Sequence, residues 1–402
     1  MSDFKAHWLN AARVRIYSAT IFIALFIYAA RCARLNWKSS GMPNGFDFVT
    51  FWAASHLSLE GRPLRAYSFD AIVSTAKLIS VNIVTPGPWS YPPTFLLAIR
   101  PLALLPAVVS YALFALATGT LFVCLLRRIL PMSAAWLPIL GFSGLWLNLA
   151  QGQNGCLTAS LALAALLLLK RRPALAGVCI GLLAIKPHLG ILFPLALACA
   201  GMWVAFMAAA VTVVLFTGVS IAVYGMHSIT LFLSSIQEAN SYVAQGFLPW
   251  EQMASLFAML RQAHLGIEPA YVLQACFALV GAGTVAWVWR NSQALETRAA
   301  ALVAGTFMVS PYIFNYDAVW LGIPIALLTV KGLRDGWLRW EREILIACWL
   351  YPVLGDLSGF QLHIGFGPLV FVALLFVAVR RTSWEKSMSD TAQGTLSVVP
   401  TR

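Results

Sequence analysis

One acidic side chain, Asp47, stands in a stretch of apolar and aromatic residues between Gly45 and Trp52. A carboxylate in partly apolar surroundings has a raised pKa and is a better base. Such a base can take the proton from a hydroxyl group while the hydroxyl oxygen attacks an electrophilic carbon. The structural alternative is that Asp47 caps a helix that we expect to start near Phe48.

Basic groups that could face a phosphate occur at three positions. Lys186 ends an apolar run and directly precedes Pro187, which biases it out of helical conformation. Its ammonium could stabilise a departing phosphate at the membrane interface, and Arg100 is a second candidate for that task. His188 could orient that group, donate to the phosphate or cap a helix. Lys186 could also simply extend its charge to the interface.

Two further turns carry neutral polar side chains and aromatic rings. Gln151, Gln153 and Asn154 offer several donors and acceptors each, which suit sugar hydroxyls or a phosphate edge. The second turn combines aromatic rings with an amide and an acid, which suits stacking on a sugar and hydrogen bonding to it; its residues are Tyr312, Asn315, Tyr316 and Asp317. Both could equally be ordinary turns between helices, with Asp317 as an N-cap.

The composition predicts that helices in a membrane position these residues. Hydrophobic residues make up 60% of the 402 residues, charged residues 10%, and the mean hydropathy is +0.79. The apolar runs lack the alternation of a barrel strand, so we expect an all-α polytopic bundle. We expect about twelve spans, near 16–30, 107–126, 134–150, 155–169, 173–185, 188–200, 203–224, 269–289, 298–313, 317–331, 343–355 and 366–380.

The distribution of basic residues predicts the orientation. The clusters at 127–128, 170–172 and 380–381 all fall in cytoplasmic loops if both termini are cytoplasmic. This requires that the proline-rich segment 93–106 does not cross the membrane by itself. Two external segments then result, 31–106 and 225–268, with amphipathic helices. Residues 1–386 form one membrane domain, and residues 387–402 are expected to be a disordered cytoplasmic tail.

Several functional classes are not indicated by the sequence. The net charge of +12 is explained by cytoplasmic loops, and no nucleic-acid-binding motif accompanies it. The seven cysteines show no metal or redox spacing, and no phosphate-binding glycine loop is present. An Asp-x-Asp motif is also absent, so a metal-bound nucleotide-sugar donor is not expected. We therefore expect no metal and no cofactor, and a lipid-linked donor.

Taken together, these motifs resemble glycosyltransferase family 87, a family of polytopic membrane proteins with a GT-C architecture. The resemblance rests on motifs that occur in order over residues 45–320: Asp47 with residues 51–54, Gly61, Tyr91-Pro92-Pro93, residues 101–106, Gly152-Gln153-Asn154, residues 176–182, Lys186-Pro187, Ser310-Pro311-Tyr312 and Tyr316-Asp317.

The resemblance implies a polyprenyl-phosphate-linked sugar donor, often mannose, and an inverting transfer to a lipid or glycan acceptor. It also implies a catalytic acid in the first external loop, which Asp47 matches, and a bacterial inner-membrane enzyme with an external active site. We assign the donor phosphate to Lys186, with Arg100 and His188 as further candidates. We expect the following residues to contact the sugar or the acceptor: Tyr91, Gln151, Gln153, Asn154, Tyr312, Asn315, Tyr316 and Asp317.

Two other functions remain open at the level of sequence. The chain could be a transporter or flippase for a lipid-linked saccharide, or an assembly protein for envelope polymers. Transporters often have repeated halves and charged residues deep within their spans. Here no halves repeat, and the charged residues lie at expected span ends, which favours the enzyme.

Overall fold

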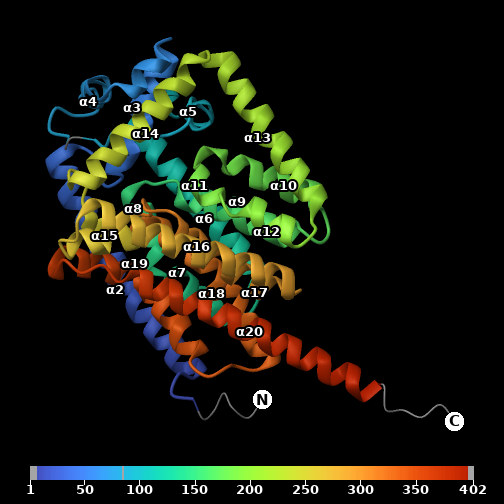
Figure 1. Ribbon diagram of the computed structural model, residues 1–402. Helices are drawn as coiled ribbons and strands as arrows, with labels where there is room; N and C mark the ends of the chain where they lie inside the picture. The colour runs from blue at the N-terminus through green and yellow to red at the C-terminus, as the bar shows by residue number, and fades with distance from the viewer. Residues whose placement is uncertain (1–6, 84–85, 397–402) are drawn as a thin grey trace.

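Helices form the regular structure of this computed structural model, which describes residues 7–83 and 86–396 (Figure 1). Those two ranges contain no β-strand, and their one β-type contact is an isolated bridge between Met253 and Phe314. The predicted all-α class is therefore confirmed.

The helices follow one another with short connections. The α-helices are α2 (Ala11–Ser40), α3 (Phe46–Leu59), α4 (Phe69–Ala76), α5 (Pro93–Ile99), α6 (Ala107–Ile129), α7 (Trp136–Leu140), α8 (Ser143–Gln151), α9 (Gly155–Leu168), α10 (Pro173–Gly181), α11 (Pro187–Gly190), α12 (Phe193–Cys199), α13 (Trp203–Tyr224), α14 (His227–Gln245), α15 (Leu256–Gln262), α16 (Ile267–Asn291), α17 (Leu295–Val309), α18 (Gly322–Asp335), α19 (Glu341–Leu362) and α20 (Gly367–Leu396). The 3₁₀ helices are η1 (Pro63–Tyr67), η2 (Leu102–Leu104), η3 (Ser133–Ala135), η4 (Leu182–Ile185), η5 (Trp250–Gln252) and η6 (Asn315–Leu321).

Fewer helices than expected are long and apolar enough to cross a membrane. Within the described part of the chain there are six: α2, α6, α13, α16, the continuous stretch Asn315–Asp335 and α20 as far as Met388. A seventh results if the pair Ser133–Leu140 and Ser143–Gln151, bent by 49°, is counted as one span. The predicted count of about twelve spans is not confirmed.

Most of the other predicted spans are helical but short, although α19 has 22 residues. α9 has 14 residues, which at ~1.5 Å per residue is ~21 Å, less than the ~30 Å hydrocarbon thickness. Nearly every residue of α17 is buried, and this helix packs against α16, α18 and α20. By contrast, only 6% of the apolar window of α2 is buried inside the protein. Apolar side chains therefore face lipid on α2 and other protein segments on α9 and α17.

Two of the long helical stretches connect the same two ends of the molecule in opposite directions. α2 begins at the lower edge of Figure 1 and leads up to α3, which lies at the top with α4, α5 and α14. The η6–α18 stretch starts at Asn315 and ends at Asp335, beside the later part of α20. One end of the molecule therefore carries α3 to α5, and the other carries the start of α2 and the end of α18.

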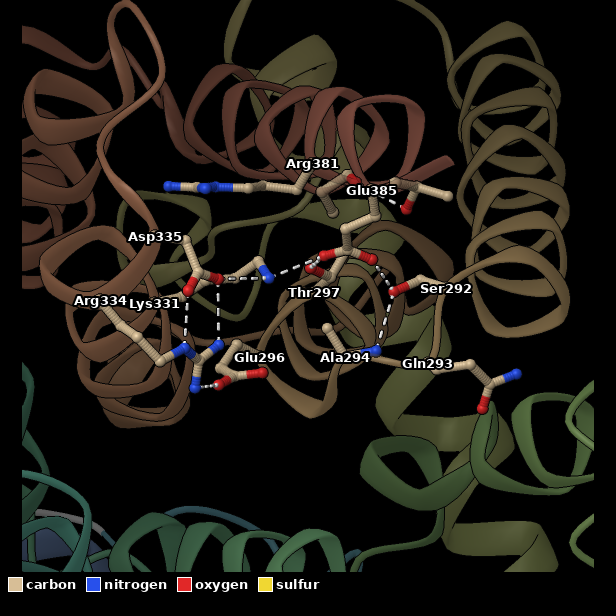
Figure 2. Close-up of polar contacts among 12 residues, drawn as sticks. Ser292, Gln293, Ala294, Glu296, Thr297, Lys331, Arg334, Asp335, Arg381 and Glu385 are labelled. Carbon is tan, nitrogen blue, oxygen red and sulfur yellow. Dashed lines mark hydrogen bonds and ion pairs between the residues drawn. The ribbon is translucent and has the colours of Figure 1, made fainter. Parts of the chain in front are cut away.

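A polar network joins α17, α18 and α20 at the end of the molecule that carries the end of α18 (Figure 2). Glu385 of α20 accepts hydrogen bonds from Ser292 and from Thr297 (2.7 Å), and it lies 3.0 Å from Lys331 Nζ. The Lys331 ammonium also lies 3.1 Å from Asp335. Because Lys331 is buried, these two carboxylates offset the desolvation of its charge. The network therefore fixes the position of α20 against α17 and α18.

An aromatic core supports α3 at the opposite end. Phe51 is fully buried, with its ring 5.0 Å from Phe95 and 6.2 Å from Trp89, both in edge-on geometry. Such contacts contribute ~0.5–1.5 kcal/mol each beyond the area that they bury. Phe48 and Trp52, which also flank Asp47 in the sequence, are buried as well.

Other predicted segments can be compared directly with the structure. The segment 93–106 is helical but broken after Ile99, at Pro101. The segment 225–268 contains α14, η5 and α15. α20 continues to Leu396 and so includes residues 387–396 of the tail that the sequence predicts to be disordered. Residues 397–402 lie outside the described residues.

Candidate active site

Two glycine turns pack against each other and place Asp47 beside Gln153. Gly45 (φ +80°) precedes α3, and its N–H donates to the Ala150 carbonyl at 2.8 Å. Gly152 (φ +71°) ends α8, and a Cβ atom there would lie 2.9 Å from Gly45 Cα and 2.7 Å from Phe48 Cβ. Both positions need a left-handed backbone, and the close approach leaves no room for a side chain on Gly152.

A chain of hydrogen bonds runs from Asp47 through Gln153 to Tyr91. Gln153 Nε2 donates to Asp47 Oδ2 at 2.9 Å, and the Tyr91 hydroxyl donates to Gln153 Oε1 at 3.0 Å. Gln153 is buried, and Asp47 and Tyr91 are half-buried. Burial raises the pKa of Tyr91, so its hydroxyl stays protonated as a donor. This chain fixes the orientation of the Gln153 amide.

Opposing influences act on the Asp47 carboxyl group. Burial raises the pKa of Asp47 and is the largest effect, while the hydrogen bond from Gln153 and the charge of Lys186 lower it. The charge of Asp317 raises it further. The balance leaves the pKa of Asp47 above its ordinary value, as a general base requires.

Lys186 and Asp317 form a buried ion pair close to Asp47. Lys186 Nζ lies 2.7 Å from Asp317 Oδ1 and 2.9 Å from Oδ2, and the two residues are 4% and 0% exposed. The same nitrogen lies 5.0 Å from the centre of the Tyr316 ring. Lys186 is therefore held by a carboxylate and an aromatic ring. A phosphate bound here would interact with the Lys186 ammonium together with Asp317.

Asn148, which the sequence analysis missed, connects this pair to the glycine turns. It is fully buried, donates to the Tyr316 carbonyl at 3.3 Å and accepts from the Cys156 N–H at 3.1 Å. A Cβ on Gly155 would lie 2.3 Å from Asn148 Nδ2, so a glycine is needed there. A single amide within the apolar run 134–150 could have indicated this role, since polar groups within spans need partners.

Two polar side chains at the site have atoms without a partner. Asn154 is 0% exposed, and neither its Oδ1 nor its Nδ2 has a hydrogen bond among the described residues. The buried Nε2 of His188 also has no partner there. Leaving such groups unpaired costs ~1–3 kcal/mol each. A ligand that offers hydroxyl or phosphate oxygens would satisfy them.

The remaining predicted residues lie apart from this group. The Tyr312 hydroxyl bonds to that of Tyr271 at 2.7 Å, within the cluster formed by α14, α15 and α16. Asn315 accepts from Tyr351 at 3.0 Å. Arg100 is exposed at the end of α5, and Gln151 is half-buried at the end of α8. The structure therefore brings together Asp47, Tyr91, Gln153, Asn154, Lys186, Tyr316 and Asp317.

An apolar cavity of about 530 Å³ begins one residue after two members of the site. Its wall starts at Pro92 and Pro93, next to Tyr91, and continues past Pro187, next to Lys186. α13 and α14 form the opposite wall with Val213 and Phe232. Because only 17% of the apolar window of α13 is buried, the cavity borders the lipid-facing surface. In the described ranges, no three His, Cys, Asp or Glu side chains are grouped so that they could hold a metal ion.

Comparison with known proteins gives one family match. Glycosyltransferase family 87 matches residues 89–311, more than half of the chain. No curated protein and no solved structure matches the chain. The matched region contains Tyr91, Gln153 and Lys186, while Asp47 and Asp317 fall outside it. With its apolar spans and clustered polar turns, the chain belongs to glycosyltransferase family 87, which indicates a membrane glycosyltransferase.

Proposed function

We propose that this protein transfers a hexose, with mannose as the first candidate, from a polyprenyl-phosphate-linked donor to a lipid or glycan acceptor. The observation that carries the proposal is the position of the Asp47 carboxylate, held by Gln153 beside the Lys186–Asp317 ion pair. The transfer takes place on the external face of the bacterial inner membrane, and both termini are cytoplasmic.

The reaction is a single displacement with inversion. An acceptor hydroxyl oxygen forms a bond to the anomeric carbon while the bond from that carbon to the phosphate oxygen breaks. Asp47 takes the hydroxyl proton, and polyprenyl phosphate leaves with the bonding electrons. A phosphate leaves without protonation, so one carboxylate is enough, in contrast to the two used in glycoside hydrolysis. The raised pKa of Asp47 suits this proton transfer.

The neighbouring groups bind and orient the substrates. Lys186, shared with Asp317, stabilises negative charge on the departing phosphate, and His188 Nε2 contributes a hydrogen bond. Arg100 is a further candidate because its exposed charge at the end of α5 is free to approach a phosphate from the membrane surface. Asn154, Tyr91 and Tyr316 contact the sugar.

The cavity beside the site supports a donor with a lipid chain. Its lining from Pro92 to Pro187 is apolar, and it borders the lipid-facing helix α13. An isoprenoid chain placed there would bury apolar surface at ~25 cal/mol per Å². Its phosphate end would lie next to Lys186. A nucleotide would find neither a glycine-rich phosphate loop nor grouped metal ligands among the described residues.

A transfer assay with a matched pair of variants tests this proposal. Purified wild type, Asp47→Asn and Asp70→Asn receive polyprenyl-phosphate-[³H]mannose and extracted native lipids and glycans, with EDTA present. Asp70 is the control because it also lies in the first turn of a helix of this region, but is exposed. We expect Asp47→Asn to lose ~10²–10⁴-fold in rate and Asp70→Asn to match wild type.

The possible failures have different meanings. Full activity of Asp47→Asn would remove Asp47 from the role of base. If wild type transferred no label, a panel of other polyprenyl-phosphate sugars would test the donor sugar. Failure of the whole panel would argue against the lipid-linked donor and favour a transporter or an assembly protein.

A further inference from the structure

A second apolar groove lies at the other end of the molecule. Its volume is about 490 Å³, and its walls come from α2, α6, α7, α18 and α19. Representative lining residues are Ser18, Leu126, Ile325 and Trp349. Its lining shares no residue with the cavity beside the candidate active site.

The end of the groove that is lined by the start of α2 is far from Asp47. It is lined by the part of α2 that ends at Ile21, whereas Asp47 follows the end of α2 at Ser40. From Ser18 to Ser40 a straight helix rises by ~33 Å. This separation is about the hydrocarbon thickness of a bilayer. The end of the groove at Arg15 therefore lies toward the membrane face opposite the candidate active site, whereas its other end reaches Gly322, five residues after Asp317.

The groove is open to the membrane. α2 packs against α7 and α8, and only 6% of its apolar window is buried inside the protein. Apolar side chains line the space between α2 and the helices α18 and α19. One wall of this space, α2, faces lipid. Water gains few hydrogen bonds from such walls, so an acyl chain is the favoured occupant.

One end of the groove carries positive charge. Arg15 is exposed there, and the Arg342 guanidinium lies 5.0 Å from the centre of the Trp337 ring. The groove lining includes these two arginines and no Asp or Glu. The groove is thus complementary to an anionic headgroup beside an acyl chain.

An unpartnered donor points to the same ligand. Trp337 lines the groove, and its buried Nε1 has no hydrogen-bond acceptor among the described residues. A buried indole N–H normally has a partner. Trp8 lines the groove as well, and tryptophan side chains typically lie at the level of lipid headgroups. A phosphate or ester oxygen of a lipid would satisfy the Trp337 donor.

We propose that this groove binds one phospholipid with an anionic headgroup. Its acyl chains lie between α2 and the α6–α18–α19 wall, and its phosphate faces Arg15, Arg342 and the Trp337 N–H. This site is separate from the proposed sugar transfer, and its ligand remains bound when the donor cavity is empty.

Native mass spectrometry of the purified full-length chain tests the site. The protein in detergent is titrated with dioleoyl phosphatidylglycerol or dioleoyl phosphatidylcholine. We expect the anionic lipid to be retained at least tenfold better, and Arg15→Gln to weaken its retention about tenfold, the effect of losing a charge-assisted contact. Arg128→Gln is the matched control, because Arg128 is also exposed on a helix but does not line the groove.

A second variant tests the apolar part of the groove. Ala326 lines it, and Ala326→Phe fills its volume, so retention of phosphatidylglycerol should be lost. Equal retention of both lipids, or equal losses in Arg15→Gln and Arg128→Gln, would overturn the proposal. If Ala326→Phe fails to fold, Ile21→Trp blocks the same groove from the exposed helix α2.

Discussion

At the scale of single residues, the Asp47 carboxyl group must satisfy two conditions. It must be ionised to accept a proton, and its pKa must be high enough to hold the proton during the transfer. Burial provides the higher pKa, while Gln153 and the charge of Lys186 limit the increase. Gln153 thus acts on Asp47 as a positioning residue and tunes its basicity.

The pH dependence of transfer should show this tuning. A general base is active only when deprotonated, so kcat/KM falls as pH drops through the pKa of Asp47. We expect this acid limb to lie above the ordinary Asp pKa of about 3.9, since burial raises it. Gln153→Leu removes the hydrogen bond that lowers the pKa and should move the limb to higher pH. Gln245→Leu, at an exposed position on α14, should leave it in place; an unchanged limb in Gln153→Leu would contradict the role of Gln153.

The Lys186–Asp317 pair predicts a specific pattern of stability. Lys186→Met or Asp317→Asn alone leaves one buried group without its partner, at a cost of ~3–5 kcal/mol in free energy of unfolding. The double variant should be more stable than the sum of the two single effects implies. Thermal unfolding in detergent measures the three variants.

An exposed ion pair provides the comparison. Arg62 is paired with Glu60 near the end of α3, and both are accessible. Substituting either partner should change stability by less than ~1 kcal/mol. If Lys186→Met unfolded at the same temperature as Arg62→Met, the buried pair would not stabilise the site.

Sequence analysis identifies most members of this group but not their pairing. Asp47, Gln153 and Lys186 stand out because each is a polar group at the end of an apolar run. That Lys186 pairs with Asp317, 131 positions later, depends on how η4 and η6 pack, which hydropathy does not encode. Tyr312 shares a turn with Asp317 but faces α16. Proximity in sequence therefore does not show which side chains share a site.

At the scale of elements, two left-handed glycines set the distance between α3 and the α8–α9 turn. Gly152 lies against Gly45 and Phe48, and this contact places Gln153 Nε2 within 2.9 Å of Asp47. If the Gly152 turn moved away from the Gly45 turn by the diameter of a side chain, the Gln153 amide would no longer reach the Asp47 carboxylate. The geometry of the site is thus controlled by backbone packing.

Alanine substitutions separate the effect of backbone conformation from the effect of close packing. Gly152→Ala and Gly201→Ala both place a side chain at positive φ, +71° and +67°, which costs ~1–2 kcal/mol each. A Cβ at Gly201 meets nothing within 4 Å, whereas one at Gly152 collides with Phe48 and Gly45. We expect Gly152→Ala to lose transfer activity at least tenfold and Gly201→Ala to keep it. The sugar-transfer assay measures both, and equal activities would show that this packing does not position Asp47.

The helix count illustrates what hydropathy can and cannot predict. Apolar composition correctly indicates helices in each predicted span, although 134–150 and 188–200 are each interrupted between two helices. It does not distinguish a side chain that faces lipid, as on α2, from one that faces protein, as on α17. Both surroundings select apolar residues, so short buried helices such as α9 look like spans in the sequence.

At the scale of the whole molecule, two polar clusters lie at opposite ends of one helical stretch. The stretch consists of η6 and α18. Asp317, in the candidate active site, lies near its start, and Asp335, in the polar network of Figure 2, is its last residue. Their separation in sequence corresponds to ~27 Å of helix, close to the thickness of the hydrocarbon layer. The clusters therefore match the two faces of a membrane.

The charge distribution predicts which face is external. Arg334 and Arg381 lie at the network end, and Arg127 lies in the last turn of α6, as expected for the cytoplasmic face. Lys77→Cys, next to the candidate active site end, and Arg128→Cys, at the other end, can be tested in a variant without the seven natural cysteines. Both positions are exposed. In spheroplasts, a membrane-impermeant maleimide should label Lys77→Cys alone, and lysis should expose Arg128→Cys. The reverse pattern would place Asp47 in the cytoplasm, where nucleotide sugars are abundant, and would argue against a lipid-linked donor.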